Sequence, residues 1–324
     1  LLTVGLAGQA QTKKIKVLID NDYCGDPDGL VALAQQVLSP TTDIVGIVGG
    51  HLNDGPGFTT RKDQATESVE KANALLDVMG MKGKLKVVAG AESAMTSADK
   101  PIDSEGARLI VAEAKKCSSE KPLFVECGAA LTNVASALLL DPSISKNIVV
   151  VWIGGQEDSF GAVPPPGYSA VEYNLNLCIP AGQVVFNKSD VRIWQVPRDA
   201  YRQCLYSTDE MHANVKPCGK TGAYLSDAID KVMTTCEGVG IAMGEVYIMG
   251  DSPLVLLTSL QSGFEADPSS SRWAPTPCPL IDAQGHYQPN PTGRIIRVYT
   301  HMDTRLMFSD MEAKLKLFSM KKGK

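Results

Sequence analysis

The chain concentrates acidic side chains in one short segment near its start. The segment 19–29 carries four aspartates, after the apolar run 15–19 and before the apolar run 30–34. The first run predicts a buried parallel strand and the second predicts the start of a helix. The carboxylates therefore belong to a loop at the carboxyl end of a strand, where open α/β sheets bind ligands. The four residues are Asp20, Asp22, Asp26 and Asp28.

Carboxylates at this density suggest a bound cation. Like charges repel and raise one another's pKa unless a cation neutralises them. Hard oxygen donors suit Ca²⁺ or Mg²⁺ better than zinc. Asp, Asn, Gly and Pro also form ordinary turns, and Asp28 could simply cap the helix with Asp26 favourable near its dipole. Four acids between a strand and a helix favour a metal or catalytic site over that structural alternative.

The rest of the chain predicts the frame that holds this loop. Strand-like and helix-like segments alternate as far as Val196, which is the βαβ rhythm of an α/β fold with a mostly parallel central sheet and helices on both faces. The expected strands are 43–48, 85–88, 123–125, 148–153 and 191–194, and the expected helices are 63–79, 105–116, 131–140 and one after Pro180.

Beyond Val196 the rhythm changes, and we interpret the rest as C-terminal decorations of a single domain. Helices are expected at 222–235, 253–260 and 304–318, a strand at 294–299, and a polar stretch at 265–291.

Composition excludes some classes of partner. The chain has 324 residues, a hydrophobic content of 44% and a net charge of -5, and it shows no basic patch with interleaved aromatics. These features argue against a nucleic-acid partner. No apolar stretch is long enough to span a bilayer. A small-molecule partner is expected, and a homo-oligomer is possible.

The first ten residues, 1–10, resemble the end of a signal peptide, with Gly8 and Ala10 before a cleavage point at Gln11. The alternative is a disordered or tag-derived arm. The signal-peptide interpretation predicts a secreted or periplasmic protein whose eight cysteines meet an oxidising compartment. No two cysteines form a zinc-type Cys-x-x-Cys pair. Four cysteines could form disulfides whose pairing the sequence leaves open: Cys204, Cys218, Cys236 and Cys278.

Further polar and glycine-rich motifs follow the later elements. Each one alone is typical of a turn or a helix cap. Their shared position at strand ends favours one common site. They are Gly49-Gly-His51, Leu131-Thr-Asn133, Gly154-Gly155, Glu172-Tyr-Asn174 and Gly250-Asp-Ser-Pro-Leu254.

This ordered set resembles the calcium-dependent nucleoside hydrolases, which are ribonucleoside N-glycosidases. The family opens with an Asp-x-Asp-x-Gly-x-Asp-Asp pattern after its first strand, similar to Asp20-Asn-Asp22 and the Asp26/Asp28 pair. The later motifs follow in family order, and the resemblance spans 14–320. It implies the Rossmann-like fold of that family and hydrolysis of a nucleoside to ribose and free base.

The resemblance also implies roles for individual residues. Asp22, Asp28 and Asp251, with the backbone carbonyl of Gly128, would hold Ca²⁺. Asp22 would also take a proton from a metal-bound water, because a carboxylate base suits so mild a Lewis acid. The ribose hydroxyls would be bound by Asp26, Glu172 and Asn174. Carboxylates near the sugar would stabilise the oxocarbenium-like charge of the transition state.

The sequence departs from the family pattern at several positions, and its segment 156–169 has no clear counterpart to a further ribose-binding asparagine. The aspartate loop is one residue longer, and we take Asp26 rather than Pro27 as the sugar-binding position. Gly250 stands where the family has a histidine that helps protonate the leaving base, and His51 replaces an asparagine expected to touch the sugar. We predict a catalytic and substrate-binding role for His51. Other candidate acids are His286, Tyr168 and Glu157, and Trp273 could stack on a base or cover the core.

Two other functions remain open. A Mg²⁺-dependent phosphatase would use the same Asp-x-Asp, but it needs a Ser or Thr after the second strand, where this chain has Gly49-Gly-His51. A ribose- or nucleoside-binding protein with lost or altered catalysis would keep the ribose-binding acids.

Overall fold

The computed structural model describes residues 14–53, 57–157, 164, 167, 171–262 and 271–322. The predicted signal-peptide segment 1–10 and the candidate acid Tyr168 lie outside the described residues.

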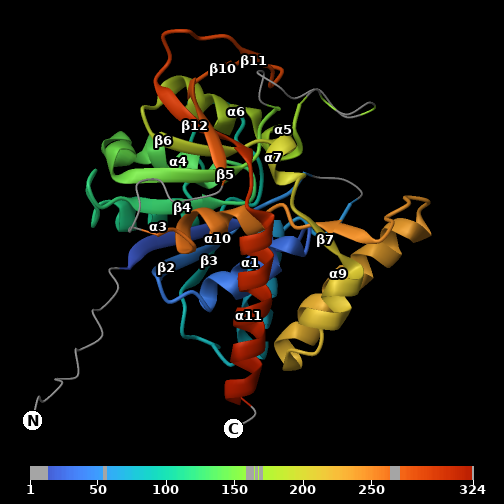
Figure 1. Cartoon of the computed structure of the whole chain (residues 1–324). Helices are drawn as coiled ribbons and strands as arrows, with labels where there is room; N and C mark the ends of the chain where they lie inside the picture. The colour runs from blue at the N-terminus through green and yellow to red at the C-terminus, as the bar shows by residue number, and fades with distance from the viewer. Residues whose placement is uncertain are drawn as a thin grey trace, which may run out of the picture.

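A twisted sheet of eight strands forms the centre of the molecule, in the order β3-β2-β1-β4-β5-β6-β12-β9 (Figure 1). Neighbouring strands are parallel except β12 and β9. The strands are β1 (Ile15–Asn21), β2 (Thr42–Gly49), β3 (Val87–Ala89), β4 (Leu123–Cys127), β5 (Ile148–Ile153), β6 (Arg192–Val196), β9 (Arg272–Pro277) and β12 (Ile295–His301).

Alternating side chains of the central strands build a core on each face of the sheet. Leu18 packs into one hydrophobic cluster and its neighbour Ile19 into another. Val150 likewise packs on the opposite face from Val149 and Val151. Successive side chains of a strand point to opposite faces, so strands apolar throughout must be covered on both sides. The predicted α/β class with a mostly parallel sheet is confirmed.

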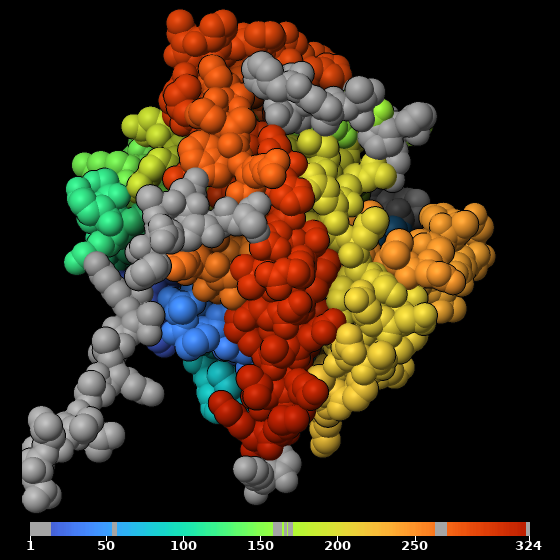
Figure 2. Space-filling model, viewed as in Figure 1, coloured from blue at the N-terminus to red at the C-terminus, as the bar shows by residue number. Residues whose placement is uncertain are grey.

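Helices cover both of these faces. The first hydrophobic cluster is closed by α3 (Glu105–Ala114), α4 (Thr132–Leu140), η1 (Pro142–Asn147), α6 (Ile179–Gln183) and η2 (Val184–Lys188). The opposite face is closed by α1 (Asp28–Val37), α2 (Gln64–Val78), α9 (Gly219–Gly238), α10 (Ser252–Ser259) and α11 (Thr304–Lys322). Helices α9 and α11 lie side by side at the surface, yellow and red in Figure 2. The described residues also include four short helices: α5 (Tyr173–Leu177), α7 (Arg198–Tyr201), α8 (Thr208–Glu210) and η3 (Met211–Val215).

The C-terminal half holds short strands that periodicity did not predict. The polar stretch contains β9, which pairs antiparallel with β12, and the small sheet of β10 (Leu280–Ile281) and β11 (Tyr287–Gln288). A second small sheet pairs β7 (Leu205–Ser207) with β8 (Val246–Ile248). The guanidinium of Arg297 lies between the rings of Trp194 and Trp273, 4.5 and 4.4 Å from their centroids. Trp273 also packs against the hydrophobic core, which is the second of the two uses that the sequence allowed.

Two further expectations can be compared with the structure. All eight cysteines are free thiols, so none of the four candidates for disulfides is paired. Over the described ranges, no helix has both the length and the apolar character needed to cross a bilayer.

Candidate active site

The carboxyl ends of β1, β2 and β4 meet at one edge of the sheet. Asn21 is the register partner of Gly49, and Asp20 is the partner of Cys127. The peptide nitrogens just beyond these strands tie the ends together: that of Gly50 donates to the Asn21 carbonyl at 2.8 Å, and that of Gly128 donates to the Asp20 carbonyl at 3.0 Å. The aspartate loop, residues 22–27, starts at this edge, and α1 begins at Asp28.

The loop forms one wall of a pocket of about 250 Å³, which we call the aspartate pocket. Every predicted metal- and ribose-binding residue except His51 lines it. Among the described residues of the lining there are five carboxylates and no lysine, arginine or histidine. The lining consists of Asp22, Asp26, Asp28, Leu52, Phe58, Gly128, Ile153, Glu172, Tyr173, Asn174, Tyr201, Ile248, Gly250 and Asp251.

Asp251, the residue just before α10, lies beside the aspartate loop in this pocket although the two are far apart in sequence. Its peptide nitrogen donates to Asp28 Oδ2 at 2.9 Å. Its own Oδ2 accepts from the side-chain amide of Asn21 at 2.8 Å. The Asn21 Oδ1 in turn accepts from the peptide nitrogen of Asp22 at 2.8 Å. Asn21 therefore orients the loop aspartates relative to Asp251, a role that the sequence did not indicate.

Gly128 leaves room for two side chains of the pocket. A Cβ atom there would lie 2.6 Å from Asp251 Oδ1 and 2.6 Å from Asn21 Nδ2. The missing side chain lets the backbone at the end of β4 approach the carboxylates. The Gly128 carbonyl also accepts from the amide of Asn174 at 3.3 Å.

Burial and mutual repulsion raise the pKa of the pocket carboxyls. Burial and then the charges of Asp251 and Asp26 raise the pKa of Asp22 and Asp28 well above the usual range. Burial raises the pKa of Asp251 to about 7, against the hydrogen bond from Asn21. It raises the pKa of Asp26 to about 6, against the hydrogen bond from the Tyr247 hydroxyl. A cation in the pocket would remove this penalty.

The donor set suits a hard divalent cation. In the parts of the chain that the structure describes, no three His, Cys, Asp or Glu side chains are already arranged as a metal site. The chemistry of the lining nevertheless fits: Asp22, Asp28 and Asp251 are buried oxygen donors, and the backbone of Gly128 lies against Asp251.

Two of the ribose-binding candidates, Glu172 and Asn174, lie at the start of α5 and are fixed by hydrogen bonds. Glu172 caps α5 and accepts from the peptide nitrogens of Asn174 and Leu175 at 3.1 and 3.0 Å. It also accepts from the peptide nitrogen of Gly155 at 2.8 Å and from the Tyr201 hydroxyl at 3.0 Å. Burial raises the pKa of Glu172 despite these bonds. The Asn174 amide donates to the Ile153 carbonyl at 2.8 Å.

His51 is not among the residues that line the pocket. Its ring is buried, with Nδ1 2.9 Å from the Leu52 carbonyl oxygen and Nε2 2.8 Å from Thr132 Oγ1. Both ring nitrogens are thus engaged in the fold, and the structure does not bring His51 together with the aspartates. The sequence placed it at the strand end correctly but could not indicate the direction of its side chain.

The other candidate acids are also absent from the described lining. His286 is half exposed, 3.5 Å from Asp282. Glu157 forms a buried ion pair with Arg198 and lines a different pocket. The space beside Gly250 is instead faced by Tyr201, whose Cδ2 would lie 3.5 Å from a Cβ at Gly250. The sequence did not single out Tyr201 or Tyr247, because an isolated tyrosine at the end of a four-residue helix or in a three-residue strand carries no spacing signal.

Comparison with known proteins identifies the family. The model of the family "Inosine-uridine preferring nucleoside hydrolase" matches residues 17–260. The chain is 32% identical over 132 residues to an Arabidopsis thaliana protein described as probable uridine nucleosidase 2, a match that spans 40% of this chain and 39% of that protein.

Solved structures show the same fold. A purine-preferring ribonucleoside hydrolase from Gardnerella vaginalis superposes with a TM-score of 0.74 at 17% identity, covering 94% of this chain and 99% of that one. An inosine-uridine preferring nucleoside hydrolase from Bacillus anthracis superposes with a TM-score of 0.62 at 15% identity, covering 93% and 99%. With the family model matching most of its length, the chain belongs to the inosine-uridine preferring nucleoside hydrolases, a generally metal-dependent family of hydrolases that act on nucleosides.

Proposed function

We propose that this protein hydrolyses the N-glycosidic bond of a ribonucleoside, giving ribose and free base, with Ca²⁺ in the aspartate pocket. One observation carries the proposal: Asp251 and the aspartate loop, more than 220 residues apart in sequence, line one pocket with Glu172 and Asn174. The metal-binding and sugar-binding halves expected of such a site are therefore adjacent.

Four groups would hold the cation: the carboxylates of Asp22, Asp28 and Asp251 and the carbonyl of Gly128. Bound Ca²⁺ would neutralise their repulsion and make a nearby water easier to deprotonate.

Asp22 is the residue that we expect to accept the proton of the attacking water. Its carboxylate lines the pocket and is held on the rigid end of β1, where its peptide nitrogen is bonded to Asn21. Without a cation, burial and the charges of Asp251 and Asp26 raise its pKa well above the usual range. A neighbouring cation favours the ionised form and restores the capacity to take a proton.

Two acids of the pocket would bind the sugar. Asp26 is held by the Tyr247 hydroxyl, and Glu172 is fixed by four donated hydrogen bonds. These acids would accept bonds from ribose hydroxyls and hold negative charge near the ring as the oxocarbenium-like charge develops. Because both acids are fixed before substrate arrives, little reorganisation accompanies the reaction.

The groups that could donate a proton to the leaving base are neutral hydroxyls. The neutral O–H donors in the described lining are Tyr173 and Tyr201. Burial and then the Glu172 charge raise the pKa of Tyr201, which makes it a weak acid that donates to Glu172. Departure of the base would therefore depend more on binding of the base than on a strong proton donor.

A reducing-sugar assay over inosine, guanosine, adenosine, uridine and cytidine, with and without calcium, tests the proposal. Ribose should appear for at least one nucleoside, and only with the metal. If the protein binds nucleosides in titration calorimetry but releases no ribose under any condition, it is a binding protein and the proposal fails.

A further inference from the structure

An aromatic ring stands exposed at the mouth of the aspartate pocket. Phe58 lies in the segment that follows β2, and 46% of its surface remains accessible. Ligand pockets are commonly lined by aromatic side chains together with a few well-placed polar groups. Phe58 also lines a second pocket of about 590 Å³, which we call the α9 pocket. The α9 pocket lies between the aspartate loop, α2 and α9 and is lined by residues that include Tyr23, Cys24, Tyr224 and Val232.

The ring of Phe58 therefore belongs to both cavities. The aspartate loop forms a wall of each: Asp22 and Asp26 face the aspartate pocket, and Tyr23 and Cys24 face the α9 pocket. A ligand whose sugar lies against the carboxylates can extend past Phe58 into a larger and mostly apolar space. That arrangement fits a sugar joined to a flat aromatic group.

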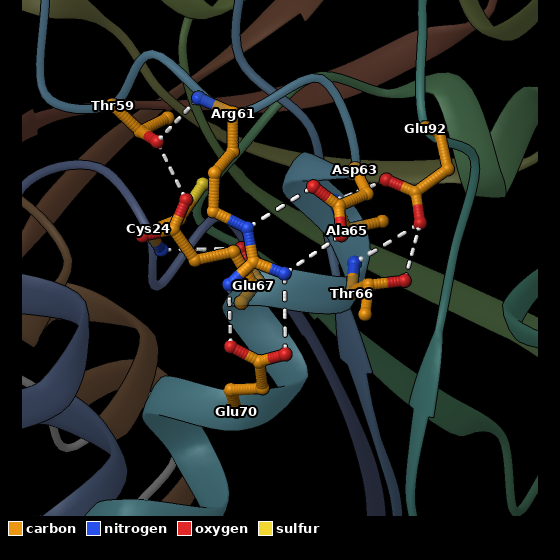
Figure 3. Close-up of polar contacts among 10 residues, drawn as sticks. Cys24, Thr59, Arg61, Asp63, Ala65, Thr66, Glu67, Glu70 and Glu92 are labelled. Carbon is orange, nitrogen blue, oxygen red and sulfur yellow. Dashed lines mark hydrogen bonds and ion pairs between the residues drawn. The ribbon is translucent and has the colours of Figure 1, made fainter.

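Hydrogen bonds and ion pairs connect the segment that carries Phe58 to α2 and to the residue before it. They are formed by Thr59, Arg61, Asp63, Glu67 and Glu70, drawn in Figure 3. The Arg61 guanidinium donates to Asp63 at 3.0 and 2.7 Å and to Glu70 at 2.6 and 3.2 Å. The Thr59 hydroxyl donates to Glu67 at 2.6 Å and accepts from the Arg61 peptide nitrogen at 3.0 Å. Two-pronged contacts of this kind fix direction as well as distance.

Helix α2 is also hydrogen-bonded to the aspartate loop. Its Ser68 hydroxyl accepts from the peptide nitrogen of Cys24 at 3.1 Å and donates to the Gly50 carbonyl at 2.9 Å. The first turn of α2 is held by Glu92, which accepts from the peptide nitrogens of Ala65 and Thr66 at 2.7 and 3.1 Å (Figure 3). Helix α2 thus binds both Thr59 and Arg61, which follow Phe58 in the chain, and the backbone of the aspartate loop at Cys24.

We propose that Phe58 is the face on which the nucleobase of the substrate stacks, and that Arg61 is the positioning residue that holds it there. The inference rests on the proposed function and adds the residue that selects the leaving group. Stacking uses the π-face that every base has, so Phe58 favours aromatic bases broadly. A purine covers more of the ring than a pyrimidine and has room to extend into the α9 pocket, so purine nucleosides gain more from it.

The decisive measurement compares ribose with nucleosides, because only the nucleoside carries the stacking group. Wild type, Phe58→Ala and Phe58→Trp are assayed with calcium for kcat/KM on inosine and uridine, and for affinity toward ribose by calorimetry. Phe58→Ala should lower kcat/KM by about 5- to 150-fold, which corresponds to 1–3 kcal/mol of base stacking, and more for inosine than for uridine. Ribose affinity should stay within about twofold, and Phe58→Trp should retain activity.

The control and the contrary outcomes are defined in the same assay. Leu140→Ala removes an exposed apolar side chain at the end of α4, on a helix absent from the aspartate-pocket lining, and should change neither quantity. An equal loss for ribose and nucleosides, or no loss for nucleosides, overturns the stacking assignment. If wild type releases no ribose, the proposed function has failed. Calorimetric titration of intact inosine onto wild type and Phe58→Ala then still decides whether Phe58 stacks.

Arg61 is tested separately because it acts through Phe58. Arg61→Ala should reduce kcat/KM for inosine by a smaller factor than Phe58→Ala and leave ribose affinity unchanged. Arg61→Lys should restore part of the loss, since lysine keeps the charge but lacks the fork. Arg108→Ala, which removes an exposed arginine paired with Asp103 at 2.7 Å, is the control. Wild-type kinetics in Arg61→Ala, or a loss that extends to ribose, overturns the positioning role.

Discussion

Buried acids occur at the ends of two strands, and they differ in what neutralises them. The aspartate pocket after β1 gathers Asp22, Asp28 and Asp251, whose pKa values are raised by burial and by one another. After β5, Glu157 is also buried, and its carboxylate accepts from Arg198 Nη2 at 2.8 Å. Burial alone would raise the pKa of Glu157, but the hydrogen bond and charge of Arg198, together with a backbone hydrogen bond, outweigh burial and the pKa is lowered.

Glu157 has a structural role, whereas the acids of the aspartate pocket require a ligand. Glu157 has its counter-charge within the fold, so the folded protein holds it ionised without outside help. Among the described residues, the lining of the aspartate pocket supplies no such cation, and its carboxylates are stabilised only by hydrogen bonds. A cation bound in the aspartate pocket would therefore relieve the repulsion between these carboxylates.

The largest expected effect is the loss of turnover in Asp22→Asn. Asparagine keeps the size of the side chain but cannot accept a proton from water, and it removes one metal-binding carboxylate. We expect kcat for ribose release to fall by about 10²–10⁴-fold. The melting temperature of the calcium-free protein should not fall, because one repelling charge is gone. The exposed Asp209→Asn is the control, and full activity in Asp22→Asn would contradict the assignment of the base.

Glu157→Gln should have the opposite profile, with stability lost and turnover kept. The variant removes the carboxylate that Arg198 faces, and breaking a buried ion pair destabilises a fold by about 3–5 kcal/mol. Because the folded-state pKa is lowered, the wild-type advantage is complete above the usual glutamate pKa of about 4.3 and disappears as pH falls through the lowered value. Urea unfolding at neutral and acidic pH measures this. A lower kcat with unchanged stability would instead revive Glu157 as a leaving-group acid.

The same contrast shows what sequence could predict and what it could not. The aspartate loop was predictable because a strand, a turn and a helix start leave local signals, and Asp251 because its motif follows in family order. His51 was assigned to the site by its strand-end position, yet its ring turns to Thr132. Side-chain direction after a Gly-Gly turn has no periodicity. The strands β7 and β8 are three residues each, too short for a pattern, so Tyr247 was not found.

Calcium should stabilise the fold through the aspartate pocket alone. A ligand that binds only the folded protein at 100 times its Kd adds about 2.7 kcal/mol to the free energy of unfolding. Wild type and Glu157→Gln should gain this increment equally, whereas Asp28→Asn should lose most of it. Thermal unfolding after chelation and after calcium is restored measures the gain. An equal gain in Asp28→Asn would place the cation elsewhere.

The smallest expected effect concerns the binding of the sugar. Its test compares two tyrosines from one small sheet. Tyr247 on β8 and Tyr206 on β7 are register partners. The Tyr247 hydroxyl donates to Asp26, whereas the Tyr206 hydroxyl donates to Glu312 of α11 at 2.6 Å. Tyr247→Phe should release Asp26 from its fixed position and raise the nucleoside KM by about tenfold, near the lower end for hydrogen bonds to charged groups, with little change in kcat.

Tyr206→Phe is the matched control for that variant, because it removes the same hydroxyl from the same small sheet. Its effect should appear in the unfolding free energy, with KM unchanged, since Glu312 does not line the aspartate pocket. If both variants raise KM alike, the small sheet acts on the pocket as a whole and Asp26 has no special dependence on Tyr247. If only Tyr247→Phe does so, Asp26 owes its sugar-binding position to that one hydroxyl, just as Glu157 owes its ionised state to Arg198.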